Sequence, residues 1–265
     1  MRNFTLSSII FLTPVLSLAQ TDTQKKWGAA IAISDANSQV AFLGGSILQI
    51  DADGNMISGG AKTNRSFSIG VIPKYYVNNR LQFRFEYEMT DINLENKIPK
   101  PTATGFLASS SYGIGTDVVK QKINRFVPGI QFDFFTNNRI KSYGGVTVQC
   151  MKYGPISRNT YSESHDVSTD TLTSWGKQII SIPGGFAVGP GVFAGFNVSC
   201  YKRFAIGAEF SSALLYCHIG GQSYQEYSYQ NIPSPIMTAT STSAESYKGI
   251  RFTRIISSVN LYYDF

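Results

Sequence analysis

An unbroken two-residue alternation between residues 81 and 90 constrains the fold of this chain more than any other stretch. Five apolar residues occupy its odd positions and five polar ones its even positions: Leu81, Phe83, Phe85, Tyr87 and Met89 against Gln82, Arg84, Glu86, Glu88 and Thr90. Successive side chains of a β-strand point to opposite faces, so this stretch predicts a strand with one apolar and one charged face. In a soluble sandwich the apolar face would point into a core, whereas in a membrane barrel it would meet lipid and the charges would line the interior.

Residues 1–19 have the features of a secretory signal peptide. Arg2 precedes an apolar run from Ile9 to Leu18, and the small residue Ala19 follows it. The run is shorter than the roughly 20 residues that a membrane-spanning helix needs, and a buried N-terminal helix is the alternative interpretation. We expect cleavage after Ala19, which leaves residues 20–265 as a single domain.

The composition is compatible with a membrane barrel and argues against nucleic-acid binding. Mean hydropathy is −0.06, yet transmembrane barrels are polar overall because half of each strand faces inward. Aromatic residues make up 13% of the chain, a share that suits strands and interfacial girdles. The formal charge of +6 suits contact with lipid phosphates or anionic glycans, and no Lys/Arg run or basic-aromatic motif indicates a nucleic-acid site.

Three short turn sequences recur at a regular interval. They are Val77–Arg80, Thr136–Arg139 and Cys200–Arg203. Their centres lie about 60 residues apart, which divides residues 20–265 into four units of two strands and one long loop. The pattern predicts an all-β fold, an eight-stranded antiparallel transmembrane β-barrel with short periplasmic turns and long extracellular loops.

The predicted strands and loops follow from this division. We expect the first strand to begin at Trp27, and the others to span residues 66–77, 78–90, 120–135, 140–153, 185–199, 204–218 and 248–265. Between them, residues 93–119, 154–184 and 220–247 form long loops rich in Ser, Thr, Tyr and Gly. Such loops are either adaptable recognition surfaces or solvated segments without a partner.

Three prolines fall on the outward face of predicted strands, at Pro73, Pro128 and Pro190. Proline cannot donate a hydrogen bond to a neighbouring strand and is uncommon in central strands. We therefore expect a local β-bulge at each of these positions.

Eight charged residues fall on inward faces of the predicted strands. They are Lys74, Arg84, Glu86, Glu88, Arg125, Asp133, Glu209 and Arg254. The interior of an eight-stranded barrel has room for side chains and little else, and an unpaired buried charge is costly. We expect these groups to form an internal network of ion pairs that fills the barrel, in preference to a narrow ion path.

No arrangement of residues predicts catalysis or a bound cofactor. The only two histidines, His165 and His218, have no serine or aspartate partner that local spacing would place in a triad. Cys150, Cys200 and Cys217 are odd in number and read as small strand residues. The acidic stretch at residues 51–55 suggests a calcium loop, but the loop positions that require glycine and glutamate hold Met56 and Lys62. We therefore expect no catalytic residue, no cofactor and no metal.

The C-terminal strand resembles that of bacterial outer-membrane β-barrel proteins. Val259, Leu261, Tyr263 and Phe265 share one face, and the sequence ends on the aromatic residue. The resemblance, to OmpA- and OmpX-type barrels and porin-like families, implies that Leu261, Tyr263 and Phe265 form the signal read by the barrel-assembly machinery. Unlike OmpA-type proteins, the sequence stops at its last strand, so we expect no peptidoglycan-binding domain.

These observations favour a non-catalytic integral protein of the bacterial outer membrane. We expect a structural or surface-interaction role through the long extracellular loops. The alternatives are a small passive porin-like channel and, less favoured, an enzyme that modifies outer-membrane lipid. The expected partners are outer-membrane lipid and lipopolysaccharide, the barrel-assembly machinery, and an extracellular ligand or protein bound by the loops.

Overall fold

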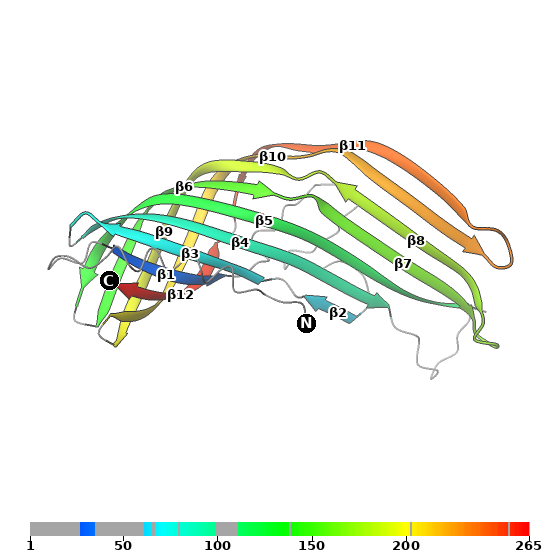
Figure 1. Ribbon diagram of the computed structural model, residues 1–265, viewed down its shortest axis with the longest axis horizontal. Helices are drawn as coiled ribbons and strands as arrows, with labels where there is room; N and C mark the ends of the chain where they lie inside the picture. Colours follow the sequence, from blue (N-terminus) through cyan, green and yellow to red (C-terminus); the bar gives the residue numbers. More distant parts are fainter. Residues whose placement is uncertain are drawn as a thin grey trace.

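The computed structural model describes residues 27–34, 61–64, 67–78, 80–98, 111–137, 139–201, 203–253 and 255–264. The predicted signal peptide, Arg254 and Phe265 lie outside these ranges. Within them the chain is all β, as predicted, and it forms twelve strands in one antiparallel sheet (Figure 1). The strands are β1 (Trp27–Ser34), β2 (Ala61–Asn64), β3 (Phe67–Tyr76), β4 (Leu81–Ile98), β5 (Ser111–Thr136), β6 (Ile140–Tyr153), β7 (Ile156–Asp166), β8 (Leu172–Ile182), β9 (Gly185–Tyr201), β10 (Phe204–Asn231), β11 (Met237–Phe252) and β12 (Ile256–Asp264). None of the described residues belongs to a helix that could cross a membrane.

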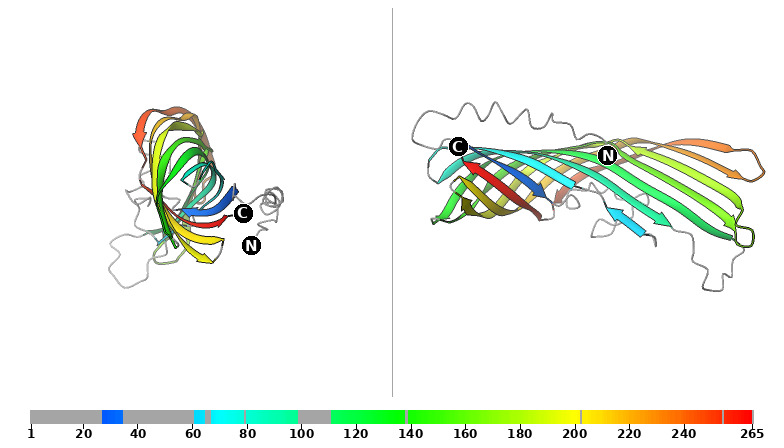
Figure 2. Two further views of the ribbon diagram at one scale, coloured as in Figure 1. Left: turned by 90° about the vertical axis from the view of Figure 1, so that its left-hand side faces the viewer. Right: turned by 60° about the horizontal axis from the view of Figure 1, so that its bottom comes forward.

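Eight of the strands pair in a closed cycle. The cycle runs β1–β3–β4–β5–β6–β9–β10–β12, and β12 returns to β1. Figure 2 shows this part of the sheet curling round when seen end-on. Because each strand of the cycle has a neighbour on both sides, the backbone groups within it are satisfied by the sheet itself.

The other four strands extend the sheet beyond the cycle, which corrects the expected count of eight. The distal part of β5 pairs with β7, β7 with β8, β8 with the distal part of β10, and β10 with β11. β2 pairs with the distal part of β4. We call β2, β7, β8, β11 and these distal parts the extension, and it projects well beyond the cycle in Figure 1.

The expectation of three long loops is therefore wrong for most of their length. Residues 154–184 contain the β7–β8 hairpin, and residues 220–247 contain the end of β10 and much of β11. The polar composition of these strands gave no strand pattern. A strand outside the core makes its backbone hydrogen bonds with neighbouring strands whatever its side chains are. The expected strand 248–265 is also divided, because β11 and β12 meet β10 in different registers. Leu214 lies opposite Phe252 and Ser211 opposite Ile256, which leaves one extra residue between them.

The three outward prolines cause no bulge, contrary to expectation. Each is paired on one side, with Ala29 opposite Pro73, Phe85 opposite Pro128 and Val148 opposite Pro190. On the other side the pairing is interrupted and resumes in the same register. A residue in an antiparallel strand directs its N–H toward one neighbour only, so proline removes one hydrogen bond without displacing the strand.

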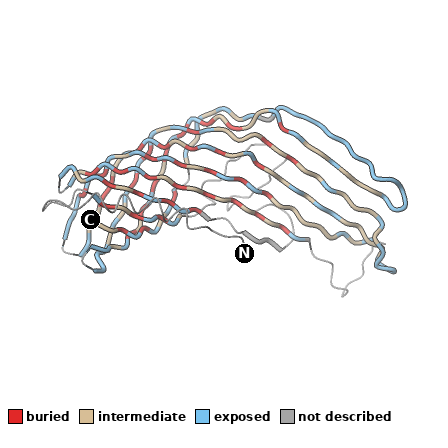
Figure 3. Tube along the Cα trace, in the orientation of Figure 1, coloured by how far each residue is buried: buried red, intermediate tan, exposed pale blue. Residues whose placement is uncertain are grey.

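The cycle has an apolar outside and a largely polar inside. Phe83 and Phe85 are 50% and 43% exposed, whereas Arg84 between them is 3% exposed. Buried and more exposed residues alternate along much of the cycle in Figure 3. The outward set, which we call the apolar belt, includes Ile31, Val71, Phe126, Ile130, Val146, Val188, Val192, Phe196, Ile206, Phe210 and Leu261.

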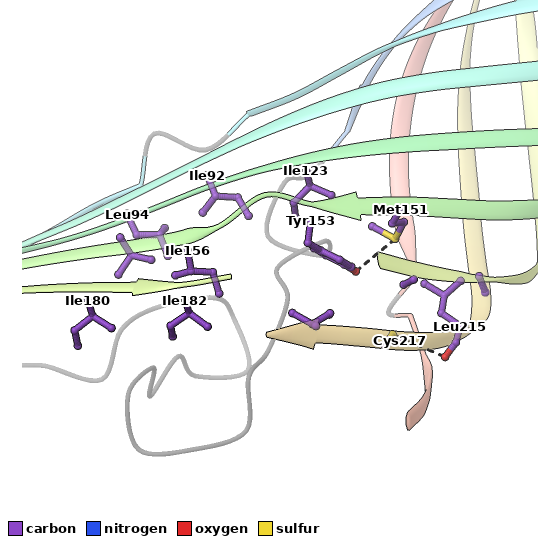
Figure 4. Close-up of a cluster of buried hydrophobic side chains, with 14 residues drawn as sticks. Ile92, Leu94, Ile123, Met151, Tyr153, Ile156, Ile180, Ile182, Leu215 and Cys217 are labelled. Atoms are coloured by element: carbon purple, nitrogen blue, oxygen red, sulfur yellow. Dashed lines mark hydrogen bonds between the residues drawn. The ribbon is translucent and has the colours of Figure 1, made fainter. Parts of the chain in front are cut away.

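A buried apolar cluster fills the junction between the cycle and the extension (Figure 4). On β4 the inward positions change from Glu86 and Glu88 to Ile92 and Leu94 as the strand enters the extension. Ile92 and Leu94 pack in the same cluster as Ile156 and Ile182 of the β7–β8 hairpin. Burial of these side chains is worth roughly 1.5–3 kcal/mol each, which helps to hold the hairpin against the longer strands.

Candidate functional site

The interior charges lie on neighbouring strands of the cycle at matching heights. Lys74 on β3 is opposite Arg84 on β4, and Glu88 on β4 is opposite Arg125 on β5. Because side chains alternate along a strand, the inward positions of β4 bring Arg84, Glu86 and Glu88 onto one face. All of these side chains are buried.

A chain of four ion pairs crosses the interior with alternating sign. Arg84 contacts Glu209 on β10 at 2.6 Å and Glu86 at 3.0 Å. Arg125 contacts Glu86 at 2.8 Å and Glu88 at 2.6 Å. Each arginine therefore bridges two carboxylates, and Glu86 lies between both arginines. Such pairing is what makes buried charge tolerable in a low-dielectric interior.

Hydroxyl groups complete the end of this chain at Glu88. Ser34 and Ser68 both donate to Glu88 Oε1. Ser68 is also 2.8 Å from Thr90 Oγ1. Glu88 thus accepts hydrogen bonds from a guanidinium and two hydroxyls, which occupy most of its lone pairs.

A second polar branch starts at Lys74. Lys74 Nζ donates to Gln131 at 3.1 Å, and Gln131 donates to Asp133 at 3.0 Å. Gln82 donates to the other oxygen of Asp133 at 2.8 Å. Lys74 therefore reaches its carboxylate through an amide and has no direct ion pair with it among the described residues.

Two tyrosines join the branches. The Tyr143 hydroxyl donates to Glu209 at 3.1 Å and is 2.7 Å from the Tyr262 hydroxyl. Lys74 Nζ lies 4.1 Å from the centre of the Tyr262 ring, a favourable cation–π distance. We call this whole set, from Ser34 to Tyr262, the interior network.

Small residues on β9 make room for Tyr143. A Cβ atom added at Gly195 would lie 2.6 Å from Tyr143 Oη and 2.6 Å from the carbonyl oxygen of Ala208. The first contact belongs to a side chain already fixed by Glu209, and the second to backbone, so neither can move away easily. A glycine at position 195 is therefore required for the tyrosine to reach Glu209.

Most of the predicted interior residues take part in the network. Lys74, Arg84, Glu86, Glu88, Arg125, Asp133 and Glu209 are all buried and connected as described, while Arg254 lies outside the described residues. Sequence reasoning did not assign Tyr262 or Ser34 a place in the network. The alternation of β12 did place Tyr262 inward, but nothing local showed that it would meet Tyr143 from a distant strand.

The predicted assembly signal lies at the end of β12. Leu261 is 48% exposed on the outer face. Tyr263 pairs with Ala29 on β1 and packs its ring 4.8 Å from that of Phe204. Phe265 lies outside the described residues.

The histidines and cysteines lie apart from the interior network. His165, near the tip of the β7–β8 hairpin, is 3.0 Å from Glu163 and stacks on Tyr112. His218 packs on the outer face against Phe186. All three cysteines are free. Among the described residues, no group of His, Cys, Asp and Glu side chains is arranged to hold a metal ion.

No protein-family model matches the chain, and no curated protein matches it. Solved structures with a related course of the chain include Neisserial surface protein A, with 12% identity over 92% of this chain and 100% of that one, at a TM-score of 0.36. CarO2 of Acinetobacter baumannii has 7% identity over 92% and 100%, at 0.38. The outer membrane protease OmpT of Escherichia coli has 9% identity over 91% and 94%, at 0.27. Likeness at this level assigns neither family nor activity.

Proposed function

We propose that this chain is an integral β-barrel protein of the bacterial outer membrane, with the eight-stranded cycle spanning the bilayer. The observation that carries the proposal is the inverted polarity of the cycle. Ion pairs of Arg84 and Arg125 occupy the inside, while side chains such as Phe83 cover the outside. In water both features are unfavourable, whereas hydrocarbon around the apolar belt makes the outside favourable.

The closed pairing supports the same proposal. A spanning sheet has no water to satisfy an open edge within the hydrocarbon, so only a closed cycle of strands is stable there. β12 closes the cycle by pairing with both β1 and β10. The interior network then acts as a plug, since its charged groups bind one another.

The length of the strands supports a position of the extension outside the membrane. β10 has 28 residues, which at about 3.3 Å per residue spans about 90 Å. A transmembrane strand needs only roughly 9–11 residues. More than half of β10 is therefore available to stand clear of the bilayer, on the side opposite the tight turns. Short turns face the periplasm in such barrels, so we place the extension on the cell surface.

The extension favours a non-catalytic role in surface interaction. Its strands are rich in Ser, Thr and Tyr, and Tyr224 and Tyr227 are each 41% exposed. Such residues make adaptable contacts at low entropic cost. We propose an extracellular ligand or protein as the partner of this surface. Outer-membrane lipid around the belt and the barrel-assembly machinery at Leu261, Tyr263 and Phe265 are the other proposed partners.

The state of the folded chain in detergent and in buffer tests the proposal. We expect residues 20–265 to fold only with detergent or lipid, and to migrate differently in a gel before and after heating. A monomer that folds in plain buffer would contradict the membrane assignment. Planar-bilayer recording separates the plugged protein from a passive channel: we expect no steady current, and an open current would favour the channel.

A further inference from the structure

The outer face of the cycle changes from apolar to basic at one height on β5 and β6. Along β5 the outward residues run from Phe126 to Lys122 and Lys120, and along β6 they run from Val148 to Lys152. The Tyr87 ring on β4 packs 4.9 Å from that of Phe126, and its hydroxyl donates to Asn124 at 3.0 Å. Tyr87 thus has its ring on the apolar side of the boundary and its hydroxyl on the polar side, an arrangement typical of tyrosines at a membrane interface.

A hollow opens at this boundary because β5 changes its neighbour there. β6 pairs with β5 as far as Ile123, and β7 takes over from Lys120, so no strand pairs with Gln121 and Lys122 on that side. The backbone N–H of Gly154 closes the gap to Lys122 O at 2.7 Å, and Gln121 Nε2 donates to Gly154 O at 3.2 Å. The remaining cavity has a volume of about 520 Å³, and Lys120, Lys122 and Ser157 line it.

Three lysines around this hollow carry positive charge that no described residue neutralises through an ion pair. The side chains of Lys120, Lys122 and Lys152 are exposed, and within the described ranges none makes an ion pair or a side-chain hydrogen bond. Lys152 is diagonal to Lys122 across the β5–β6 pair. Long side chains at diagonal positions can reach the same point, so Lys152 adds its charge to that of Lys122. Among the described residues, Asp91, opposite Lys122, is the one carboxylate that lines the hollow, so the lysines outnumber it.

We infer that this hollow binds the phosphate of a membrane lipid whose acyl chains lie along the apolar belt below it. The site is on the extension side of the belt, so the lipid is a phosphorylated glycolipid of the outer leaflet, of the lipid A type. Lys120 and Lys122 contact the phosphate, and Phe126 and Tyr87 contact the first carbons of the chains. The inference rests on the proposed function, because it requires the belt to face a bilayer.

The test uses the full mature chain folded in a neutral detergent, with lipid A bearing both phosphates as the probe. The site variant is K120Q/K122Q, and the charge-matched control is K97Q/K177Q, which removes two lysines from the extension. We expect affinity for lipid A to fall about 30-fold in the site variant and less than threefold in the control. Dephosphorylated lipid A should bind the unaltered protein about as weakly as lipid A binds the site variant.

Three results would overturn the inference. The two variants could lose affinity equally, dephosphorylated lipid A could bind as tightly as the phosphorylated form, or inorganic phosphate could compete at the concentration of the lipid. The last result would make free phosphate the ligand. Heat-modifiable migration, measured on each variant, keeps this test separate from the proposed function: a folded barrel without lipid preference rejects the site alone.

Discussion

Arg84 offers the sharpest test of the interior network, because its removal leaves a buried carboxylate without a cation. Arg84→Met keeps an extended apolar side chain at this position, but among the described residues Glu209 then retains only the Tyr143 hydroxyl as a partner. Breaking a buried ion pair from one side costs about 3–5 kcal/mol. Glu86 is less affected, since Arg125 still contacts it at 2.8 Å. We therefore expect Arg84→Met to lower the free energy of unfolding by about 3–5 kcal/mol.

A double variant and a control separate charge from packing. In R84M/E209M both charges are gone, and we expect this variant to recover at least half of the loss, since apolar replacement of a whole buried pair is often neutral. Arg158→Met breaks the Arg158–Asp117 pair at 2.7 Å, whose side chains are 26% and 15% exposed. Exposed pairs contribute about 0–1 kcal/mol, and this pair, which is bidentate but partly solvated, should cost less to break than the buried one.

Urea unfolding of the barrel in lipid vesicles measures these differences, followed by the fluorescence of the two tryptophans, Trp27 and Trp175. The reasoning fails if Arg84→Met costs no more than Arg158→Met. It also fails if the double variant is as unstable as the sum of its two single variants, because the charges would then contribute independently.

Three further predictions address the outer face, the packing and the extension. Phe83→Lys should destabilise the barrel in vesicles by up to about 2–4 kcal/mol, because a cation on the lipid face costs that much at the bilayer midplane and less toward the interfaces; unchanged urea unfolding would show that this face does not meet hydrocarbon. Gly195→Val should displace Tyr143 from Glu209 and lower the free energy of unfolding by about 1–3 kcal/mol through overpacking, and an unchanged unfolding curve would show that the strand adapts. At the hairpin tip, the Ser168 hydroxyl, with the N–H and hydroxyl of Thr169, lowers the pKa of Asp166 to about 2 from 3.8. This stabilisation is complete above pH 3.8 and disappears as the pH falls toward 2, so Ser168→Ala should raise the pKa seen by NMR titration, and an unmoved titration would contradict the assignment.

Most of the correct predictions came from the alternation of apolar and polar residues within single strands. On β4 it separated Phe83 and Phe85 from Arg84 and Glu86, and the structure exposes the first two and buries the others. The recurring turn sequences at residues 77–80, 136–139 and 200–203 separately predicted the boundaries between β3 and β4, between β5 and β6, and between β9 and β10. These features are local, because a period of two depends only on which face of one strand is buried.

The extension was missed because it has no such local signature. β7 and β8 are polar on both faces along much of their length, and their sequences read as loop. Their strand conformation depends on pairing with β5 and β10, and the paired residues lie 37 to 57 positions apart along the chain. The expected bulges at Pro73, Pro128 and Pro190 were wrong for a related reason: the consequence of a missing N–H depends on which neighbour it faces.

The sequence alone determined that the chain is all β, which residues of the cycle face inward, and that charges of both signs gather inside. Only the tertiary structure decided which charges meet, that Tyr143 and Tyr262 join them, that β12 closes the cycle on β1, and that the chain continues as sheet beyond it. The physical reason is that the alternation along a strand determines whether a side chain points inward or outward. Which residue it contacts on another strand depends on the register between the two strands. Register is set by pairing across the whole sheet, and no short stretch of sequence contains it.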